Sequence, residues 1–71
     1  MPLIQVTIVA GRSVEQKHEL IRNLSEATSS TLDVPLDRVR VVIYEVSGDE
    51  WGIGGVPFSA ARAPQPEPGA R

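Results

Sequence analysis

Hydrophobic and polar residues alternate over residues 3–9. Ile4, Val6 and Ile8 share one side of this segment, and polar residues stand between them. A period of two, supported by β-branched residues, predicts a strand with one packed face. The sequence Ala10-Gly11-Arg12 breaks the alternation, so we expect the strand to end at about residue 9.

The period changes after Gly11 to one typical of a helix. Ser13 and Gln16 form a capping-box pattern, in which each side chain satisfies a backbone amide of the other. Apolar and small residues then recur at helical spacing: Val14, Ile21, Leu24, Ala27, Thr28, Thr31 and Leu32. We expect the helix to end before Val34-Pro35, because a residue that precedes proline is pushed out of the α region.

Residues 39–46 predict a second strand, whose apolar run Val41-Val42-Ile43 favours burial on both faces. One helix between two strands predicts a βαβ unit with parallel strands. The glycine-rich residues 51–56 predict a tight hairpin or a bulged loop. The fold class is therefore α/β (α+β), with a domain over residues 1–58. Residues 59–71, rich in proline, are expected to form a flexible tail.

Size and composition favour self-association. A chain of 71 residues buries only about 60% of the surface that it exposes when unfolded. Cysteine is absent and His18 is the one histidine, so we expect no disulfide, no metal and no cofactor. One helix on two strands also leaves strand edges open. Partner chains remain as the source of stability.

Charge and hydropathy argue against nucleic acid and membranes as partners. A net charge of −2 and a pI near 5.2 give no basic surface for nucleic acid. No apolar run of about 18 residues is present, so we expect no membrane span. Residues 1–10 do not look like a signal peptide. A soluble, cytoplasmic protein is the expectation.

Pro2 is the most informative candidate for chemistry. Methionine is generally removed before a small second residue, which would turn the Pro2 nitrogen from an amide into a secondary amine. Such an amine can act as a general base when its pKa lies near the working pH. Desolvation beside Trp51 and nearby arginine cations would lower that pKa. Proline at position 2 is also common in proteins without such a role.

Arg12 and Arg40 can each hold a carboxylate through two parallel hydrogen bonds. An ion pair between chains or a solvated strand edge explains Arg40 equally well. Pro2 and Arg12 lie at opposite ends of the first strand, about 30 Å apart at 3.3 Å per residue. Arg12 must therefore come from a neighbouring chain if both serve one site. Arg40 begins the second strand at the Pro2 end, so it can come from its own chain or another.

Trp51 and the glycines at 52, 54 and 55 can supply an apolar pocket wall and a close-fitting loop. A core tryptophan beside a turn is the simpler explanation. The glycines follow no strand-to-helix junction, so they do not form a nucleotide loop. His18 falls on the outer side of the predicted helix and is expected to be solvated.

Taken together, these residues resemble the 4-oxalocrotonate tautomerase family, the short-chain branch of the tautomerase superfamily. The resemblance runs without gaps from Pro2 to about Gly55. Its landmarks are Pro2, Gly11-Arg12-Ser13, Glu15-Gln16-Lys17, Leu20-Ile21-Arg22, Ser25-Glu26-Ala27, Leu32-Asp33, Pro35-Leu36, Val39-Arg40-Val41 and Gly52-Ile53-Gly54-Gly55.

The resemblance implies roles for these residues. Pro2 would be the general base, and Arg12 and Arg40 would bind the carboxylate and carbonyl oxygens of the substrate. Trp51 stands where the family has a pocket aromatic, usually phenylalanine. The subunits would pair into four-stranded sheets and assemble as a homohexamer, with arginines crossing between subunits.

Two further positions would line the pocket. Val9 and Ile53 stand where related dehalogenating members carry an arginine and a water-activating glutamate. Without that glutamate, hydration of a haloacrylate is disfavoured. Trp51 makes a bulkier wall than phenylalanine, so the preferred substrate can differ from that of the typical member.

The sequence thus predicts a tautomerase that converts a 2-hydroxydienoate, a small carboxylate, to a 2-oxoenoate in the catabolism of aromatic compounds. One alternative is a biosynthetic tautomerase that acts on a different substrate. Another is covalent catalysis, in which the Pro2 amine adds to an aldehyde to form an iminium ion. A third is an oligomeric module that has kept the scaffold and lost the chemistry.

Overall fold

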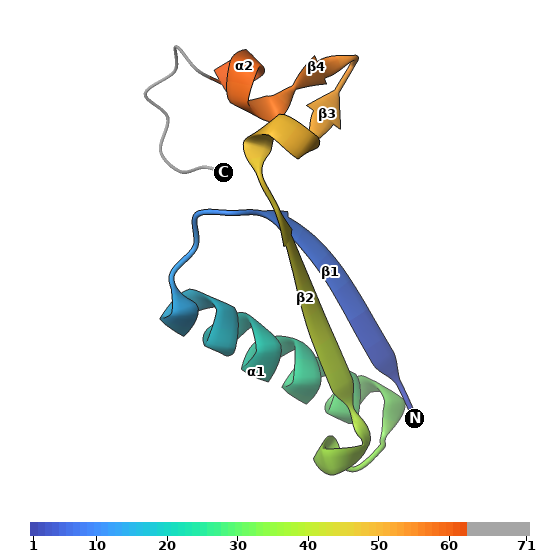
Figure 1. Cartoon of the computed structure of the whole chain (residues 1–71). Coiled ribbons are helices and arrows are strands. Elements are labelled where there is room, and N and C mark those ends of the chain that lie inside the picture. The colour runs from blue at the N-terminus through green and yellow to red at the C-terminus, as the bar shows by residue number, and fades with distance from the viewer. Residues whose placement is uncertain (63–71) are drawn as a thin grey trace.

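The computed structural model describes residues 1–62, with side chains as far as Ala60. Two long strands and one long helix dominate the chain, and a small C-terminal unit follows them (Figure 1). The elements in order are β1 (Leu3–Val9), α1 (Val14–Leu32), the 3-10 helix η1 (Leu36–Arg38), β2 (Arg40–Val46), the 3-10 helix η2 (Gly48–Glu50), β3 (Gly52–Ile53), β4 (Val56–Pro57) and α2 (Phe58–Arg62).

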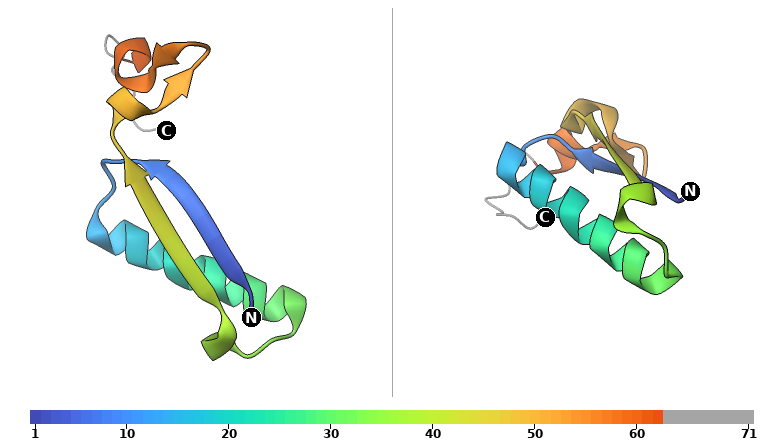
Figure 2. Two further views of the ribbon diagram at one scale, coloured as in Figure 1. Left: turned by 45° about the vertical axis from the view of Figure 1, so that its right-hand side comes forward. Right: turned by 90° about the horizontal axis from the view of Figure 1, so that it is seen from below.

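Strands β1 and β2 are parallel, in a register that pairs Leu3 with Arg40 and Val9 with Val46. Helix α1 connects them and packs over one face of the sheet (Figure 2). The alternation in β1 accounts for this arrangement, because it places Ile4, Val6 and Ile8 on the face that α1 covers. All three are half-buried there. The predicted βαβ unit is confirmed.

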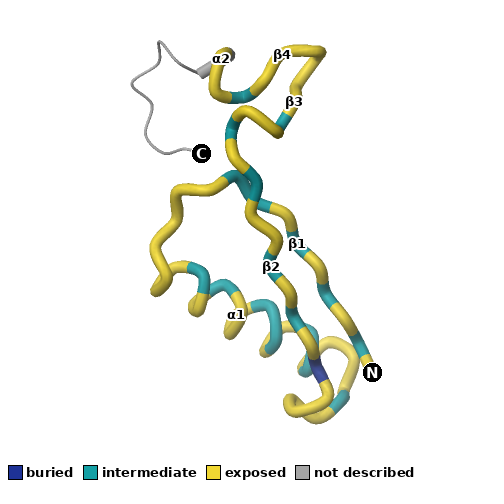
Figure 3. The backbone as a smooth tube through the Cα atoms, in the orientation of Figure 1, coloured by how far each residue is buried: buried dark blue, intermediate teal, exposed yellow. Residues whose placement is uncertain are grey.

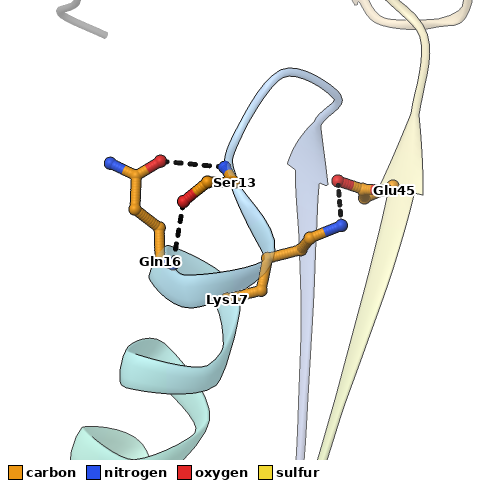
Figure 4. Close-up of polar contacts among 4 residues, drawn as sticks. All are labelled: Ser13, Gln16, Lys17 and Glu45. Carbon is orange, nitrogen blue, oxygen red and sulfur yellow. Dashed lines mark hydrogen bonds and ion pairs between the residues drawn. The ribbon is translucent and has the colours of Figure 1, made fainter.

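The capping box at the start of α1 is confirmed (Figure 4). The Gln16 backbone N–H donates to Ser13 Oγ at 3.1 Å, and the Ser13 backbone N–H donates to Gln16 Oε1 at 3.0 Å. The helix ends at Leu32, and Asp33 follows in the left-handed conformation with φ of 57°. The predicted stop before Val34-Pro35 is correct to within a residue.

The hairpin predicted for residues 51–56 is present as the antiparallel pair β3–β4. Gly54 and Gly55 form its two-residue loop, with φ of 60° and 88°. Positive φ at both central residues defines a type I′ turn, which glycine adopts without strain. The expected tail needs one correction: residues 59–62 are helical, because α2 begins at Phe58 and packs on η2 and β4. The rest of that tail, 63–71, lies outside the described residues.

The described part of the chain has almost no core of its own (Figure 3). Val39, 8% exposed, is its one buried hydrophobic side chain. Val42, expected to be buried, is 37% exposed because a single helix covers only one face of the sheet. The radius of gyration is 15.1 Å, whereas a compact domain of this length has about 11 Å.

The uncovered face of the sheet carries a continuous row of exposed residues: Leu3, Gln5, Thr7, Val42 and Tyr44. Gln5 Nε2 donates to the Tyr44 hydroxyl at 3.1 Å across the two strands of this face. No helix among residues 1–62 is long and apolar enough to cross a membrane.

Candidate active site

Pro2 and Arg40 lie side by side where the two parallel strands begin. The Arg40 backbone N–H donates to the Pro2 carbonyl oxygen at 3.0 Å. Pro2 is half-buried and Arg40 is exposed. Parallel strands in register bring their first residues to the same end of the sheet, so the predicted neighbourhood of these two residues is found within a single chain.

The turn η1 holds the Arg40 side chain. Arg40 Nη1 donates to the Asp37 carbonyl oxygen at 2.8 Å, and a longer bond of 3.4 Å runs to the Val39 carbonyl oxygen. Within the described residues, the Nε and Nη2 groups have no partner. These two donors form one edge of the guanidinium and match the two oxygens of a carboxylate. Arg40 is therefore anchored through one nitrogen and still able to bind an anion.

Arg12 lies at the opposite end of the sheet, in the loop that leads from β1 to α1. The Ala10 backbone N–H donates to the Val46 carbonyl oxygen at 2.8 Å and fixes the start of this loop. Arg12 is exposed and lines an open groove of about 250 Å³ together with Ile8, Gln16, Lys17 and Leu20.

The remaining predicted pocket residues also lie at the Arg12 end. Val9, half-buried, is the last residue of β1. Trp51, half-buried, and Ile53, 54% exposed, belong to the C-terminal unit beyond the end of β2 (Figure 1). Within one chain, Pro2 therefore lies beside Arg40, whereas Arg12 and Trp51 lie at the opposite end of the sheet. The seven residues of β1 separate the two sets by about 23 Å.

Several polar contacts near the site carry no clear sequence signal. Lys17 Nζ and Glu45 Oε2 form an ion pair at 3.1 Å that ties the first turn of α1 to the end of β2 (Figure 4). The bond from Arg40 to the Asp37 carbonyl depends on η1, a three-residue turn that no periodicity predicts. Ser59, which falls in the expected tail, donates through Oγ to Asp49 Oδ1 of η2 at 2.5 Å.

Other titratable residues lie outside these two sets. His18 is exposed, as predicted, and lines a second open groove with Lys17 and Glu45. The hydrogen bond from Arg22 to Glu19, with N and O 2.8 Å apart, raises the pKa of Arg22 on the outer surface of α1. Among residues 1–62, no cluster of histidine and acidic side chains could hold a metal ion.

Comparison with known proteins tests the resemblance. A family model described as "Tautomerase enzyme" matches residues 2–61. The 2-hydroxymuconate tautomerase of Pseudomonas sp. strain CF600 is 52% identical over 62 residues, which cover 87% of this chain and 98% of that protein.

Solved structures agree. The heterohexamer 4-oxalocrotonate tautomerase of Chloroflexus aurantiacus matches with a TM-score of 0.81 and 46% identity, over 83% of this chain and 95% of its own. A 4-oxalocrotonate tautomerase homologue of the tomaymycin biosynthetic pathway matches with a TM-score of 0.83 and 36% identity, over 93% and 100%. The resemblance and the fold class inferred from the sequence are confirmed. The chain therefore belongs to the tautomerase family and is a tautomerase, an isomerase.

Proposed function

We propose that the chain converts 2-hydroxymuconate, or a close 2-hydroxydienoate, to the 2-oxoenoate, with the free amine of Pro2 as the general base. The observation that carries this proposal is the direct contact of Pro2 with Arg40, whose Nε and Nη2 donors have no partner among the described residues. A base and an anion-binding cation therefore share one end of the sheet. Relatives named 2-hydroxymuconate tautomerase, at 52% identity, support the substrate.

The proposed reaction requires two things of the protein, a base and fixed positive charge. The amine takes the proton of the 2-hydroxyl group, and the electron pair moves into the conjugated chain. The resulting ammonium then gives a proton to a carbon of that chain, so no net proton is gained or lost. Arginine donors stabilise the negative charge that develops on the oxygens. The reaction needs no redox step.

The site is proposed to be shared between chains of a homohexamer. Val9 lies about 23 Å from Pro2 in its own chain, from the rise of β1. Arg12, Trp51 and Ile53 lie at or beyond that same far end of the sheet. A neighbouring chain placed with its opposite end at Pro2 would bring these residues to the base. The apolar residues exposed on the uncovered sheet face favour such an assembly.

The experiment follows the ultraviolet absorbance of 2-hydroxymuconate as it ketonises. Removing the Arg40 guanidinium, by Arg40→Ala, is expected to lower kcat/KM by about 100-fold, because a fixed donor to the developing charge is lost. Arg22→Ala is the matched control, since Arg22 lies on the outer surface of α1 and pairs with Glu19. Equal loss in both variants, or no loss in Arg40→Ala, would count against the proposed site.

A second candidate is a biosynthetic tautomerase with a different 2-hydroxydienoate-like substrate. The half-buried Trp51 favours it, because this side chain offers a large apolar surface in place of a polar contact. The 36% identical homologue of the tomaymycin pathway supports it as well. A monocarboxylate turned over much faster than 2-hydroxymuconate would favour this candidate. Inactivity of the Met1-free protein on both would favour the non-catalytic module.

A further inference from the structure

The C-terminal unit, residues 48–62, projects beyond the ends of β1 and β2 (Figures 1 and 2). It comprises η2, β3, β4 and α2, and α2 packs on η2 and β4. Its hairpin pairs only two residues on each strand. A hairpin this short does not hold its shape alone in water, so other contacts must fix the position of Trp51 and Ile53.

One such contact joins η2 to α2. Ser59 Oγ, in the first turn of α2, donates to Asp49 Oδ1, in η2, at 2.5 Å. An acceptor that carries a charge makes this hydrogen bond stronger than one between neutral groups. Asp49 lies two residues before Trp51, so the bond acts close to the tryptophan.

Gly48 shows independently that η2 and α2 meet closely at this point. A Cβ atom at Gly48 would lie 3.2 Å from Ser59 Cβ and 3.3 Å from the Ser59 backbone nitrogen. Because one of these neighbours is backbone, it cannot turn aside as a flexible side chain does. The Phe58 backbone N–H also donates to the Trp51 carbonyl oxygen, at 2.6 Å. The base of the hairpin is thus closed by one backbone bond and one side-chain bond.

We propose that Ser59 and Asp49 are positioning residues, whose hydrogen bond against Gly48 holds the hairpin so that Trp51 and Ile53 present a fixed apolar wall. They do not touch the reacting atoms. The further consequence, that this contact helps to set which dienoate is accepted, rests on the proposed function. A wall that shifts changes substrate binding before it changes proton transfer, because Trp51 and Ile53 offer apolar surface and are neither the base nor the anion-binding donors.

Trp51 is the only tryptophan of the chain, so its fluorescence reports directly on the hairpin without any substrate. Ser59→Ala is expected to shift the emission maximum to longer wavelength, because a loosened hairpin admits water to the indole. Asp49→Asn keeps the acceptor oxygen and is expected to resemble the wild type, whereas Asp49→Ala is expected to resemble Ser59→Ala. Ser30→Ala, an exposed serine on α1 with no side-chain hydrogen bond among the described residues, is the matched control.

Kinetics give the second readout. Ser59→Ala is expected to raise KM for 2-hydroxymuconate by about fivefold with little change in kcat, as befits the loss of one hydrogen bond outside the reacting centre. Its ratio of kcat/KM between a dicarboxylate and a monocarboxylate dienol should also change. Gly48→Ala, which drives a methyl group against the Ser59 backbone, is expected to shift the emission in the same direction as Ser59→Ala.

The outcomes are distinguishable. An emission maximum in Ser59→Ala and Gly48→Ala equal to that of the wild type would overturn the proposal. Loss of secondary structure or of assembly in Ser59→Ala, seen by circular dichroism or gel filtration, would also overturn it in favour of a purely structural role. If the wild type ketonises no dienoate but the emission shift occurs, the proposed function fails while the positioning of Trp51 stands.

Discussion

At the scale of single residues, one chain brings together only part of the proposed site, Pro2 and Arg40. Pro2 and Arg40 were predicted to lie together because parallel strands start at one end, and the 3.0 Å bond between their backbones confirms it. The roles of Pro2, Arg12 and Arg40 stay predictions. The anchoring of Arg40 by the Asp37 carbonyl could not be predicted. It depends on the conformation of η1, which leaves no repeating pattern in the sequence.

The Lys17–Glu45 ion pair offers a prediction at this scale. Its side chains are 26% and 34% exposed, so solvent screens the pair only in part. Glu45→Gln is expected to lower the free energy of unfolding by about 0.5–1 kcal/mol at low salt, and by less at high salt. Urea denaturation at two salt concentrations measures both effects. If the energy lies in the pair, Lys17→Met and the double variant with Glu45→Gln should each lose as much stability as Glu45→Gln alone. Losses that add up in the double variant would argue against the pair.

At the scale of elements, prediction succeeded where a local signal exists. The strand β1 follows a period of two, and α1 lies between a capping box and a Val-Pro stop, so their bounds agree with the structure. Helix α2 was missed because its five residues are too few to show a period and a proline-rich stretch follows. The exposure of Val42 was missed because an apolar run does not say which chain covers it.

The capping box is the element whose energy is most easily tested. Ser13→Ala removes the acceptor for the Gln16 backbone N–H and is expected to cost about 1 kcal/mol of stability. Thermal and urea unfolding measure this loss, and Ser30→Ala within the same helix serves as the control. A Ser13→Ala protein as stable as the control would show that α1 is held by packing alone and that its cap contributes nothing measurable.

At the scale of the whole molecule, the described part of a single chain has almost no hydrophobic core of its own. Its one buried hydrophobic side chain among the described residues and its long shape favour association with other copies. The proposed shared site would need such copies as well. Self-association was predicted from size and composition. Oligomers among the similar solved structures, such as the heterohexamer of Chloroflexus aurantiacus, agree with it. The hexamer of this chain remains a prediction, which sedimentation or light scattering can measure.

A mixing experiment tests whether the site is shared. Pro2→Ala and Arg12→Ala are each expected to be nearly inactive when assembled alone. If Pro2 and Arg12 of one site come from different chains, co-assembly in equal amounts should restore about a quarter of wild-type activity, because random subunits complete that share of sites. No recovery in assemblies proven to be mixed would place both residues in one chain and contradict the shared site.

The proposed mechanism depends on the free amine of Pro2 as the base. It is tested most directly by comparing two forms of the unaltered sequence, with and without Met1, each verified by intact mass. The Met1-free form should ketonise 2-hydroxymuconate at least about 100-fold faster, because in the other form the Pro2 nitrogen is an amide that cannot accept a proton. Equal rates for the two forms, at equal assembly state, would contradict the account.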